Sequence, residues 1–286
     1  MNQDKLITLA LMMVALSAIS GLVLITVFIF KEGVPIILET GVRGFFLSSD
    51  WNPSAGRFGI LSMIIGSLVV TVAAMSIGAV FGLSLAIVLT QFCPAKLAAV
   101  LKPIIELLAG IPSVVYGFMG VVTLVPLIRT YLGGPGLSVL AASIVLGIMV
   151  LPTVTSISVD ALQAVPRSYW EGSVAMGATN WQTTHMIMLK AARSGIVAAI
   201  ILGMGRALGE TMAVIMVAGN ALEVPRSLLD PVRTLTSNIA LEMGYATGRH
   251  REALFATGVT LFVIIMVFNT TALVISRRTA GGRETK

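Results

Sequence analysis

The sequence predicts an all-α integral membrane protein with six transmembrane helices. Hydrophobic residues make up 56% of the 286 residues and charged residues only 11%, whereas about a quarter of the residues in a soluble domain are charged. A helix needs about 20 predominantly apolar residues to cross a bilayer. Six stretches meet this requirement, namely residues 6–30, 59–90, 104–128, 137–159, 188–219 and 254–276. Several contain glycine or proline, which membrane helices tolerate.

Residues 1–58 are expected to form the first transmembrane helix and a segment at the outer interface. The apolar length of residues 6–30 exceeds that of a signal-peptide core, so we expect an uncleaved anchor helix, with a cleaved signal as the alternative. Residues 31–58 combine turn residues with the aromatic side chains of Phe45, Phe46 and Trp51. Aromatic residues gather at membrane surfaces, so this segment is expected to be partly helical and to lie there.

The other five helices lie within residues 59–276 and form the predicted core. In the third helix, residues 104–128, Pro103 suits the first helical position, and Glu106 would lie in the first turn, where the helix dipole stabilises a carboxylate. We therefore expect Glu106 to be structural. The alternative is that it faces a passage through the bundle, because acids inside membranes are commonly functional. Residues 277–286 form a basic tail.

Two hydrophilic connections within the core carry further information. Residues 160–187 form the longest inner loop, and their spacing predicts a short helix within residues 164–178, starting after Pro166 and followed by a turn at Gly177. A structured inner loop indicates a protein partner. Residues 220–253 carry charges of both signs, and would either dip into the membrane or contact an external protein. With both termini inside, Lys and Arg are slightly more numerous on the inner side, which favours that orientation.

Several site chemistries are excluded by residue content. Cys93 is the only cysteine, which rules out an internal disulfide and a cysteine cluster for zinc or iron–sulfur. His185 and His250 stand far apart, so we expect loop residues and no metal site. The sequence has no GxxxxGK[ST] motif and would not hydrolyse ATP by that route. The net charge of +6 comes without the basic stripe and interleaved aromatic residues that nucleic-acid binding uses.

Two charges stand deep within the fifth apolar stretch, away from its ends. Arg206 and Glu210 are four residues apart, so on one helix their side chains would pair. Facing lipid, each would cost roughly 2.5–3.5 kcal/mol, so both should face protein or water. Gly205 and Gly209 form a GxxxG spacing that would let another helix pack closely. We expect Arg206 either to bind an oxyanion in a passage, with Glu210 holding it, or to form a structural ion pair with Glu210.

The inner loop reads EGSVAMGATNWQTTHMIMLK and resembles the EAA loop of ABC-transporter permeases. Small residues replace the two alanines of that pattern, which should preserve a tight packing surface, and Lys190 replaces its final proline. The resemblance implies that this loop inserts into a groove on a separate ATPase. The positions that match it are Glu171, Gly172, Ser173, Gly177, Ile187 and Leu189.

Two further blocks, ELLAGIPSVVYGFMG and GRALGETMAVIMVAGN, resemble the phosphate-importer permease family, and the second is closer to its PstC subunit than to its PstA subunit. The segment DWNPSAGRFGI is similar to the outer part of the same subunit. This resemblance covers residues 50–276 and implies a MetI-like ABC importer permease in the bacterial inner membrane, with Arg206 and Glu210 in translocation. It further implies a homologous PstA-like permease, a PstB-like ATPase pair that holds ATP and Mg²⁺, and an external PstS-like phosphate-binding protein.

The residues alone leave other functions open. A secondary transporter or channel for an oxyanion would use Arg206 and Glu210 for anion or proton conduction, although no inverted repeat is recognisable. An intramembrane enzyme finds little support, because no nucleophile and base or metal set stands at helical spacing. Molybdate, tungstate or sulfate would suit an arginine-lined passage as well as phosphate does, since phosphate rests on the resemblance.

Overall fold

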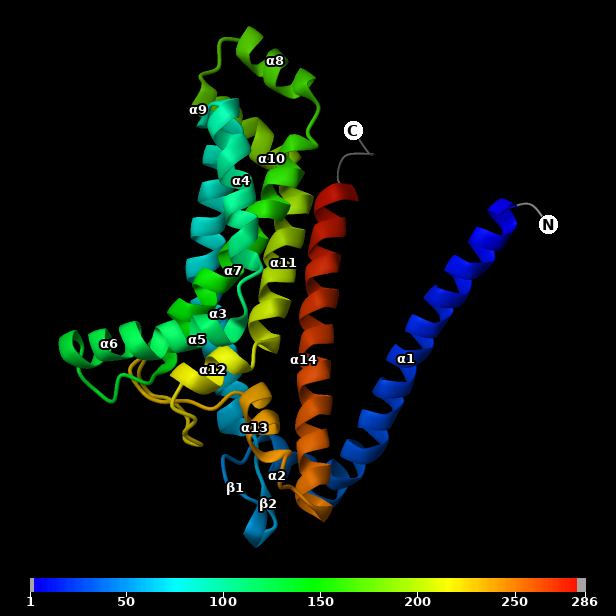
Figure 1. Ribbon diagram of the computed structural model, residues 1–286, viewed down its shortest axis with the longest axis vertical. Helices are drawn as coiled ribbons and strands as arrows, with labels where there is room; N and C mark the ends of the chain where they lie inside the picture. The colour runs from blue at the N-terminus through cyan, green and yellow to red at the C-terminus, as the bar shows by residue number, and fades with distance from the viewer. Residues whose placement is uncertain (1–2, 282–286) are drawn as a thin grey trace.

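The computed structural model describes residues 3–281, which are mostly helical (Figure 1). Among these described residues, five helices are long and apolar enough to cross a membrane, namely Ile7–Thr40, Leu61–Phe92, Ser113–Tyr131, Val139–Gln163 and Gly248–Thr271. The pair Asn180–Ala191 and Arg193–Gly209, bent by 71°, makes a sixth when it is counted as one span. The predicted all-helical architecture is confirmed.

Three helices form the centre of the bundle. Helix α7 (Val139–Gln163) packs along both α3 (Leu61–Ile87) and α11 (Arg193–Gly209). The approach of α3 to α7 depends on small residues, because a Cβ atom on Gly78 of α3 would lie only 2.8 Å from the carbonyl oxygen of Gly147 on α7. Most side chains of α7 are buried as a result. The chain continues from α3 through a π-helical turn, η2 (Val88–Phe92).

The prediction of one continuous third helix over residues 104–128 is wrong. Four helical segments occupy this region: α4 (Ala95–Ala109), α5 (Ser113–Met119), the π-helical η3 (Gly120–Leu124) and α6 (Val125–Tyr131). The chain breaks between α4 and α5 because proline disfavours a helical conformation in the residue before it, and Ile111 precedes Pro112. Helix α4 starts after Pro94 and contains Pro103 in its interior. Glu106 therefore lies near the end of α4 and outside its first turn.

The inner loop contains the predicted short helix. Its elements are α8 (Arg167–Ala175), α9 (Asn180–Gln182), the π-helical η4 (Thr183–Met188) and α10 (Leu189–Ala191). Helix α8 starts after Pro166, and Gly177 follows it with a φ of 84°, as the predicted turn requires. Although Lys190 stands where the EAA pattern has proline, the chain still bends, between α10 and α11. Figure 1 shows α8 at one end of the molecule, with the start of α1 and the end of α14 toward the same end.

The fifth predicted helix, residues 188–219, is interrupted at Ala192 and again after Gly209. Helix α12 (Met212–Val217) begins beyond the second break. Glu210 has an extended backbone at this break, with a ψ of 131°. Its carboxylate accepts hydrogen bonds from the backbone N–H groups of Thr211 at 3.1 Å and Ala213 at 3.3 Å. These bonds satisfy donors that the start of a helix leaves free, which explains why the helix restarts here.

The outer segment is partly helical, as predicted, but Phe45 and Trp51 are buried within the protein, and Phe46 is half-buried. The elements at this end are α1 (Gln3–Thr40), α2 (Val42–Phe46), β1 (Trp51–Asn52), the 3-10 turn η1 (Pro53–Ala55), β2 (Arg57–Phe58), α13 (Leu235–Glu242) and α14 (Gly248–Gly281). Strands β1 and β2 pair as an antiparallel hairpin. Phe45 and Trp51 are buried with Leu254 of α14 in one hydrophobic cluster, because α1 extends to Thr40 and the segment after it packs against α14.

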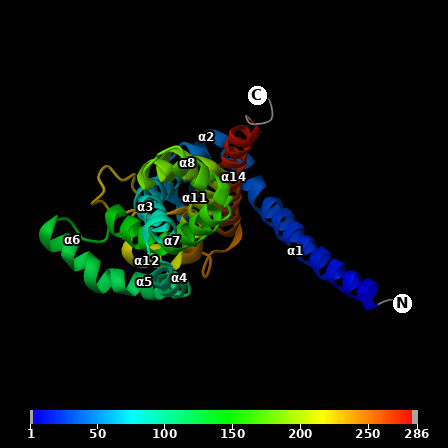
Figure 2. The same cartoon turned by 90° about the horizontal axis from the view of Figure 1, so that it is seen from above.

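Both ends of the chain extend the helices further than predicted. Helix α1 touches α14 only through its C-terminal half, where the rings of Phe28 and Phe255 lie 5.5 Å apart, while its N-terminal half leaves the bundle (Figures 1 and 2). His250 lies in α14 and not in a loop. Residues 277–281 of the predicted tail continue α14, and residues 282–286 lie outside the described part of the chain.

Candidate functional site at two helix breaks

The break between α4 and α5 and the break between α11 and α12 lie close together in the structure. Helix α5, which follows one break, packs on α12, which follows the other (Figure 1). Glycine is required at their contact, because a Cβ atom on Gly117 would lie 2.8 Å from the sulfur of Met216 and 3.0 Å from the Cα atom of Ala213. Irregular backbone within a membrane is tolerated only where protein or water satisfies its polar groups. The paired breaks therefore mark a region that faces protein or water.

Arg206 lies in the last turn of α11, beside this region. Its side chain is half-buried, and its Nη1 atom donates a hydrogen bond of 2.9 Å to Oγ1 of Thr153 on α7. The predicted ion pair with Glu210 is wrong, since α11 ends at Gly209 and the Glu210 carboxylate binds the start of α12 instead. Within residues 3–281, Arg206 forms no ion pair with an acidic side chain.

Glu210 stabilises the break between α11 and α12 through both its side chain and its backbone carbonyl group. Besides the bonds of its carboxylate to the start of α12, its carbonyl oxygen accepts a hydrogen bond of 3.0 Å from Oγ1 of Thr236. A carboxylate at a helix N-terminus is also favoured by the helix dipole. The role that geometry gives Glu210 is to stabilise the conformation in which α11 stops and α12 begins.

Tyr116 and Thr153 belong to this site and were not predicted. The Tyr116 hydroxyl donates a hydrogen bond of 2.8 Å to the carbonyl oxygen of Leu108, so its side chain bridges the break between α4 and α5. Thr153 contacts Arg206 from 53 residues away in the sequence, a separation at which no local pattern signals a contact.

Glu106 is not brought to Arg206 or Glu210 by any hydrogen bond or ion pair in the described residues. It is exposed and lines a cavity of about 700 Å³ between α4, η2 and the end of α7. Lys102 and Arg167 line the same cavity, and Lys102 forms an ion pair with Asp160 at 2.9 Å. The cavity is therefore a mixed-charge site toward the end where α8 lies.

The predicted coupling residues lie together in the inner loop. Glu171 and Gly172 are exposed on α8, and a Cβ atom added to Gly177 would meet nothing within 4 Å, so a positive φ and not crowding requires glycine there. The Ser173 and Thr183 hydroxyl oxygens lie 2.9 Å apart and share a hydrogen bond, which joins α8 to η4. Further along, Ile187 and Leu189 are half-buried on η4 and α10, next to α11.

The packing predicted for Gly205 and Gly209 is not made within the chain. No atom of the described residues would lie within 4 Å of a Cβ atom on either glycine. The close contact of α11 is made instead by Gly203, where a Cβ atom would lie 2.8 Å from Cγ1 of Val150 on α7. The face of α11 that carries Gly205 and Gly209 is open.

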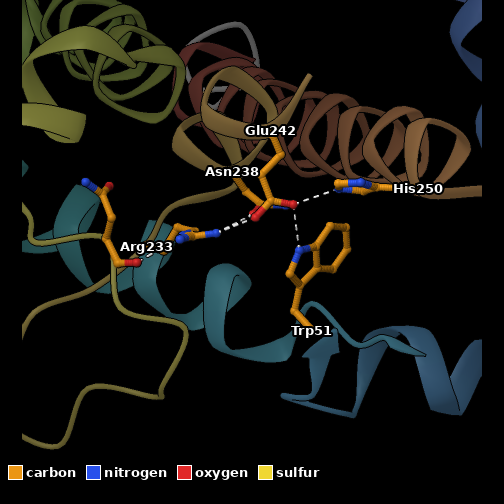
Figure 3. A network of polar contacts seen from close by, with 6 residues as sticks. Trp51, Arg233, Asn238, Glu242 and His250 are labelled. Carbon is orange, nitrogen blue, oxygen red and sulfur yellow. Dashed lines mark hydrogen bonds and ion pairs between the residues drawn. The ribbon is translucent and has the colours of Figure 1, made fainter. Parts of the chain in front are cut away.

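A second polar cluster lies at the outer end and was also not predicted (Figure 3). The Glu242 side chain is 9% exposed. It accepts hydrogen bonds from Trp51 Nε1 at 2.9 Å, Arg233 Nη1 at 2.7 Å and His250 Nε2 at 2.8 Å. Arg233 Nη1 also donates to Oδ1 of Asn238 at 3.1 Å. One buried carboxylate thus joins the hairpin, the segment before α13 and the start of α14.

Related sequences share most of this chain. Residues 78–281 match the family described as "Binding-protein-dependent transport system inner membrane component". The Bacillus subtilis "Probable ABC transporter permease protein YqgH" is 44% identical, over 89% of this chain and 84% of that protein. The "Phosphate transport system permease protein PstC" of Xylella fastidiosa is 38% identical over 82% of this chain and 77% of the relative, and that of Mesorhizobium japonicum is 36% identical over 79% and 76%.

Solved structures share the fold at low sequence identity. A chain of a bacterial alginate ABC transporter superposes with a TM-score of 0.62 at 16% identity, covering 96% of this chain and 97% of its own. A chain of the inward-facing MetNI methionine ABC transporter superposes with a TM-score of 0.60 at 22% identity, covering 77% and 97%. The predicted fold of an ABC importer permease is confirmed.

Proposed function

The chain belongs to the family of binding-protein-dependent transport system inner membrane components, and from this premise we propose that it is the permease subunit of an ATP-driven importer of inorganic phosphate. Two relatives described above are named for phosphate transport. The observation in the fold that carries the proposal is Arg206, a guanidinium inside a membrane span without an acidic partner in residues 3–281. Such a group suits a phosphate oxyanion.

The two helix breaks would form the wall of the translocation path. Thr153 holds one guanidinium nitrogen of Arg206, which leaves the other donors for phosphate oxygens. Glu210 supports the path indirectly, because its carboxylate keeps α12 in place and leaves the charge of Arg206 uncompensated. Glu106 would line the inner part of the path beside Lys102. One arginine binds weakly enough to release its anion, as transport requires, so selectivity would rest mainly with the external binding protein.

A second, homologous permease would close the open face of α11. An arginine that faced lipid would cost roughly 2.5–3.5 kcal/mol, and Arg206 is only half-buried. Gly205 and Gly209 lie on the same helix with nothing of this chain against them, and small residues let a membrane helix approach closely. A PstA-like subunit that packs on these glycines would shield Arg206 from lipid and complete the path.

The inner loop would couple transport to a PstB-like pair of ATPase subunits, which hold ATP and Mg²⁺. The exposed face of α8, with Glu171 and Gly172, would enter a groove on the ATPase. The Ser173–Thr183 hydrogen bond joins α8 to η4, and η4 continues through α10 to α11, which bears Arg206. A displacement of α8 on nucleotide binding would therefore reach the helix breaks. This chain itself is a transport subunit and not an ATPase.

This arrangement defines the orientation that we propose in the bacterial inner membrane. The loop containing α8 and both termini would lie in the cytoplasm, and the β1–β2 hairpin would lie outside. A PstS-like phosphate-binding protein would deliver the anion at that outer end. The arrangement agrees with the resemblance of the inner loop to the EAA pattern and with the start of α1 and the end of α14 lying toward the end of the molecule where α8 lies (Figure 1).

Reconstitution tests this function. The chain would be purified with its copurifying subunits, placed in proteoliposomes with ATP inside, and supplied outside with phosphate-loaded binding protein carrying ³²P. We expect uptake that requires both ATP and the binding protein. Uptake without ATP would instead identify a secondary transporter or channel. ATP-driven uptake of molybdate, tungstate or sulfate, with none of phosphate, would keep the importer class and change the substrate.

A further inference from the structure

The hairpin of β1 and β2 is built to present a polar surface outward. Trp51 pairs with Phe58 and both are buried, while Asn52 pairs with Arg57 and both are exposed. Figure 1 places this hairpin at the end of the molecule opposite α8. Two strands are not stable alone in water, so the hairpin depends on the buried pair for its position and leaves its other face free.

Glu242 fixes the hairpin to the rest of the outer end. Its carboxylate binds Trp51 of the hairpin, Arg233 of the preceding segment and His250 of α14. Burying a carboxylate is expensive unless its charge is paired and its lone pairs accept hydrogen bonds, and here both conditions are met. Hydrogen bonds that satisfy a buried carboxylate in this way make its immediate surroundings rigid. The hairpin is therefore held in one orientation, as a surface that binds without prior ordering would be.

The same network reaches the candidate transport site. Arg233 Nε donates to the carbonyl oxygen of Asn220 at 3.0 Å, and Nδ2 of Asn220 donates to the carbonyl oxygen of Ile215 on α12 at 2.8 Å. The backbone N–H of Val232 also binds the carbonyl oxygen of Ala218 at 2.8 Å. A force on the hairpin would thus be transmitted by hydrogen bonds to α12, which borders the break at Glu210.

We propose that the exposed face of this hairpin, formed by Asp50, Asn52, Ser54 and Arg57, is the surface on which the soluble external binding protein docks. The inference rests on the proposed function. The face carries charges of both signs and no large apolar side chain, so it fits the hydrated surface of a soluble protein and not lipid or the apolar flank of a second permease. The contact through Glu242 and Arg233 would carry docking to α12.

The exposed ion pair of Asp50 with Arg57 makes a clean test possible. Exposed ion pairs contribute little to folding stability, so changing this pair should leave the hairpin folded. The complete complex would be placed in lipid nanodiscs, and its affinity for phosphate-loaded binding protein measured with ATPase stimulation as a second readout. We expect Arg57→Asp to raise Kd about tenfold or more. The matched control is Arg249→Asp, which changes the exposed Glu39–Arg249 pair where α1 ends and α14 begins. For this variant we expect Kd to change less than twofold.

The outcomes separate this inference from the proposed function. If the unaltered complex fails to bind the loaded protein, the proposed function is wrong. If it binds and Arg57→Asp binds equally well, the importer stands and the docking surface is refuted. If Arg57→Asp loses the second permease during purification while Arg249→Asp keeps it, the hairpin belongs to the interface between permeases and the inference is again overturned. Loss of binding with all subunits present supports it.

Discussion

Arg206 is the residue whose loss should most reduce transport. Arg206→Gln removes the positive charge but keeps a hydrogen-bond donor for Thr153, so we expect assembly to persist and phosphate uptake to fall about 100-fold, the scale of a lost charge-assisted bond. Uptake of ³²P into proteoliposomes measures this. Arg193→Gln, at the start of the same helix, is the matched control. Normal uptake by Arg206→Gln would reduce Arg206 to a structural residue.

Glu242 should matter for stability rather than for anion binding. Glu242→Gln leaves the partly buried Arg233 without its counter-charge, which we expect to lower the free energy of unfolding by about 3 kcal/mol. Thermal unfolding in detergent, followed by tryptophan fluorescence, provides the measurement. Glu39→Gln breaks the exposed pair with Arg249 and should change stability by about 1 kcal/mol or less. Equal losses for the two variants would contradict the role of burial.

The site could be predicted in part at this scale. Arg206 is visible in the sequence because a charge inside an apolar stretch must have a reason, and its position beside a packed helix follows from that cost. The sequence could not show whether Arg206 pairs with Glu210, because the predicted ion pair assumed that one continuous helix carries both residues. Thr153 reaches Arg206 from a different span, and Tyr116 contacts Leu108 across a break in the chain that the predicted continuous helix did not contain.

Among the elements, the turn after α8 should decide coupling. Gly177 has a φ of 84°, which costs a residue with a Cβ atom roughly 1–2 kcal/mol. Gly177→Asp adds a charge to the surface proposed to meet the ATPase, so we expect an assembled complex whose ATPase is no longer stimulated by loaded binding protein.

Two further variants interpret the Gly177 experiment. Gly172→Ala lies in helix α8, where the added Cβ atom would meet nothing within 4 Å, and should keep stimulation. Gly177→Asn, which tolerates a positive φ better than most residues, should keep more stimulation than Gly177→Val. Full stimulation of the Gly177→Asp complex would refute the coupling assignment.

The sequence predicted the helices better than their interruptions. Apolar stretches and the helix after Pro166 follow directly from composition and spacing. The breaks do not change hydropathy, so a continuous apolar stretch concealed them. The residue before Pro112 could have signalled the first break. The second depends on the Glu210 side chain turning back to bind the start of α12, a choice that periodicity does not reveal.

For the whole molecule, the proposal requires a stable assembly with other subunits. We expect the tagged chain, purified in mild detergent, to bring with it a second six-span protein and a P-loop ATPase, both identified by mass spectrometry. Gly205→Leu faces open space in this chain, so it should insert normally but recover far less of the second permease. Gly203→Leu would meet Val150 within α7 and should lower the yield of folded chain instead. Recovery of the chain alone in several detergents would favour a secondary transporter.

The outer end shows why the arrangement of the whole molecule exceeds what the sequence reveals. Trp51 and Glu242 are 191 residues apart, and each alone suggests an interfacial aromatic residue or a loop charge. Their burial follows only once α1, the hairpin and α14 are brought together. The apolar stretches were thus predictable one by one, whereas the packing that buries Trp51 and Glu242 together was not.

The contact between α1 and α14 has a consequence for biosynthesis. A Cβ atom on Gly33 would lie 2.7 Å from the backbone nitrogen of Ala256, so the first helix finds this close neighbour only in a helix that is translated long after it. Because a membrane helix forms all its backbone hydrogen bonds within itself, α1 can remain in the bilayer without a packing partner until α14 is inserted. The outer cluster closes only after α14 is inserted, so a ribosome stalled before residue 248 should leave Trp51 accessible to water-soluble quenchers.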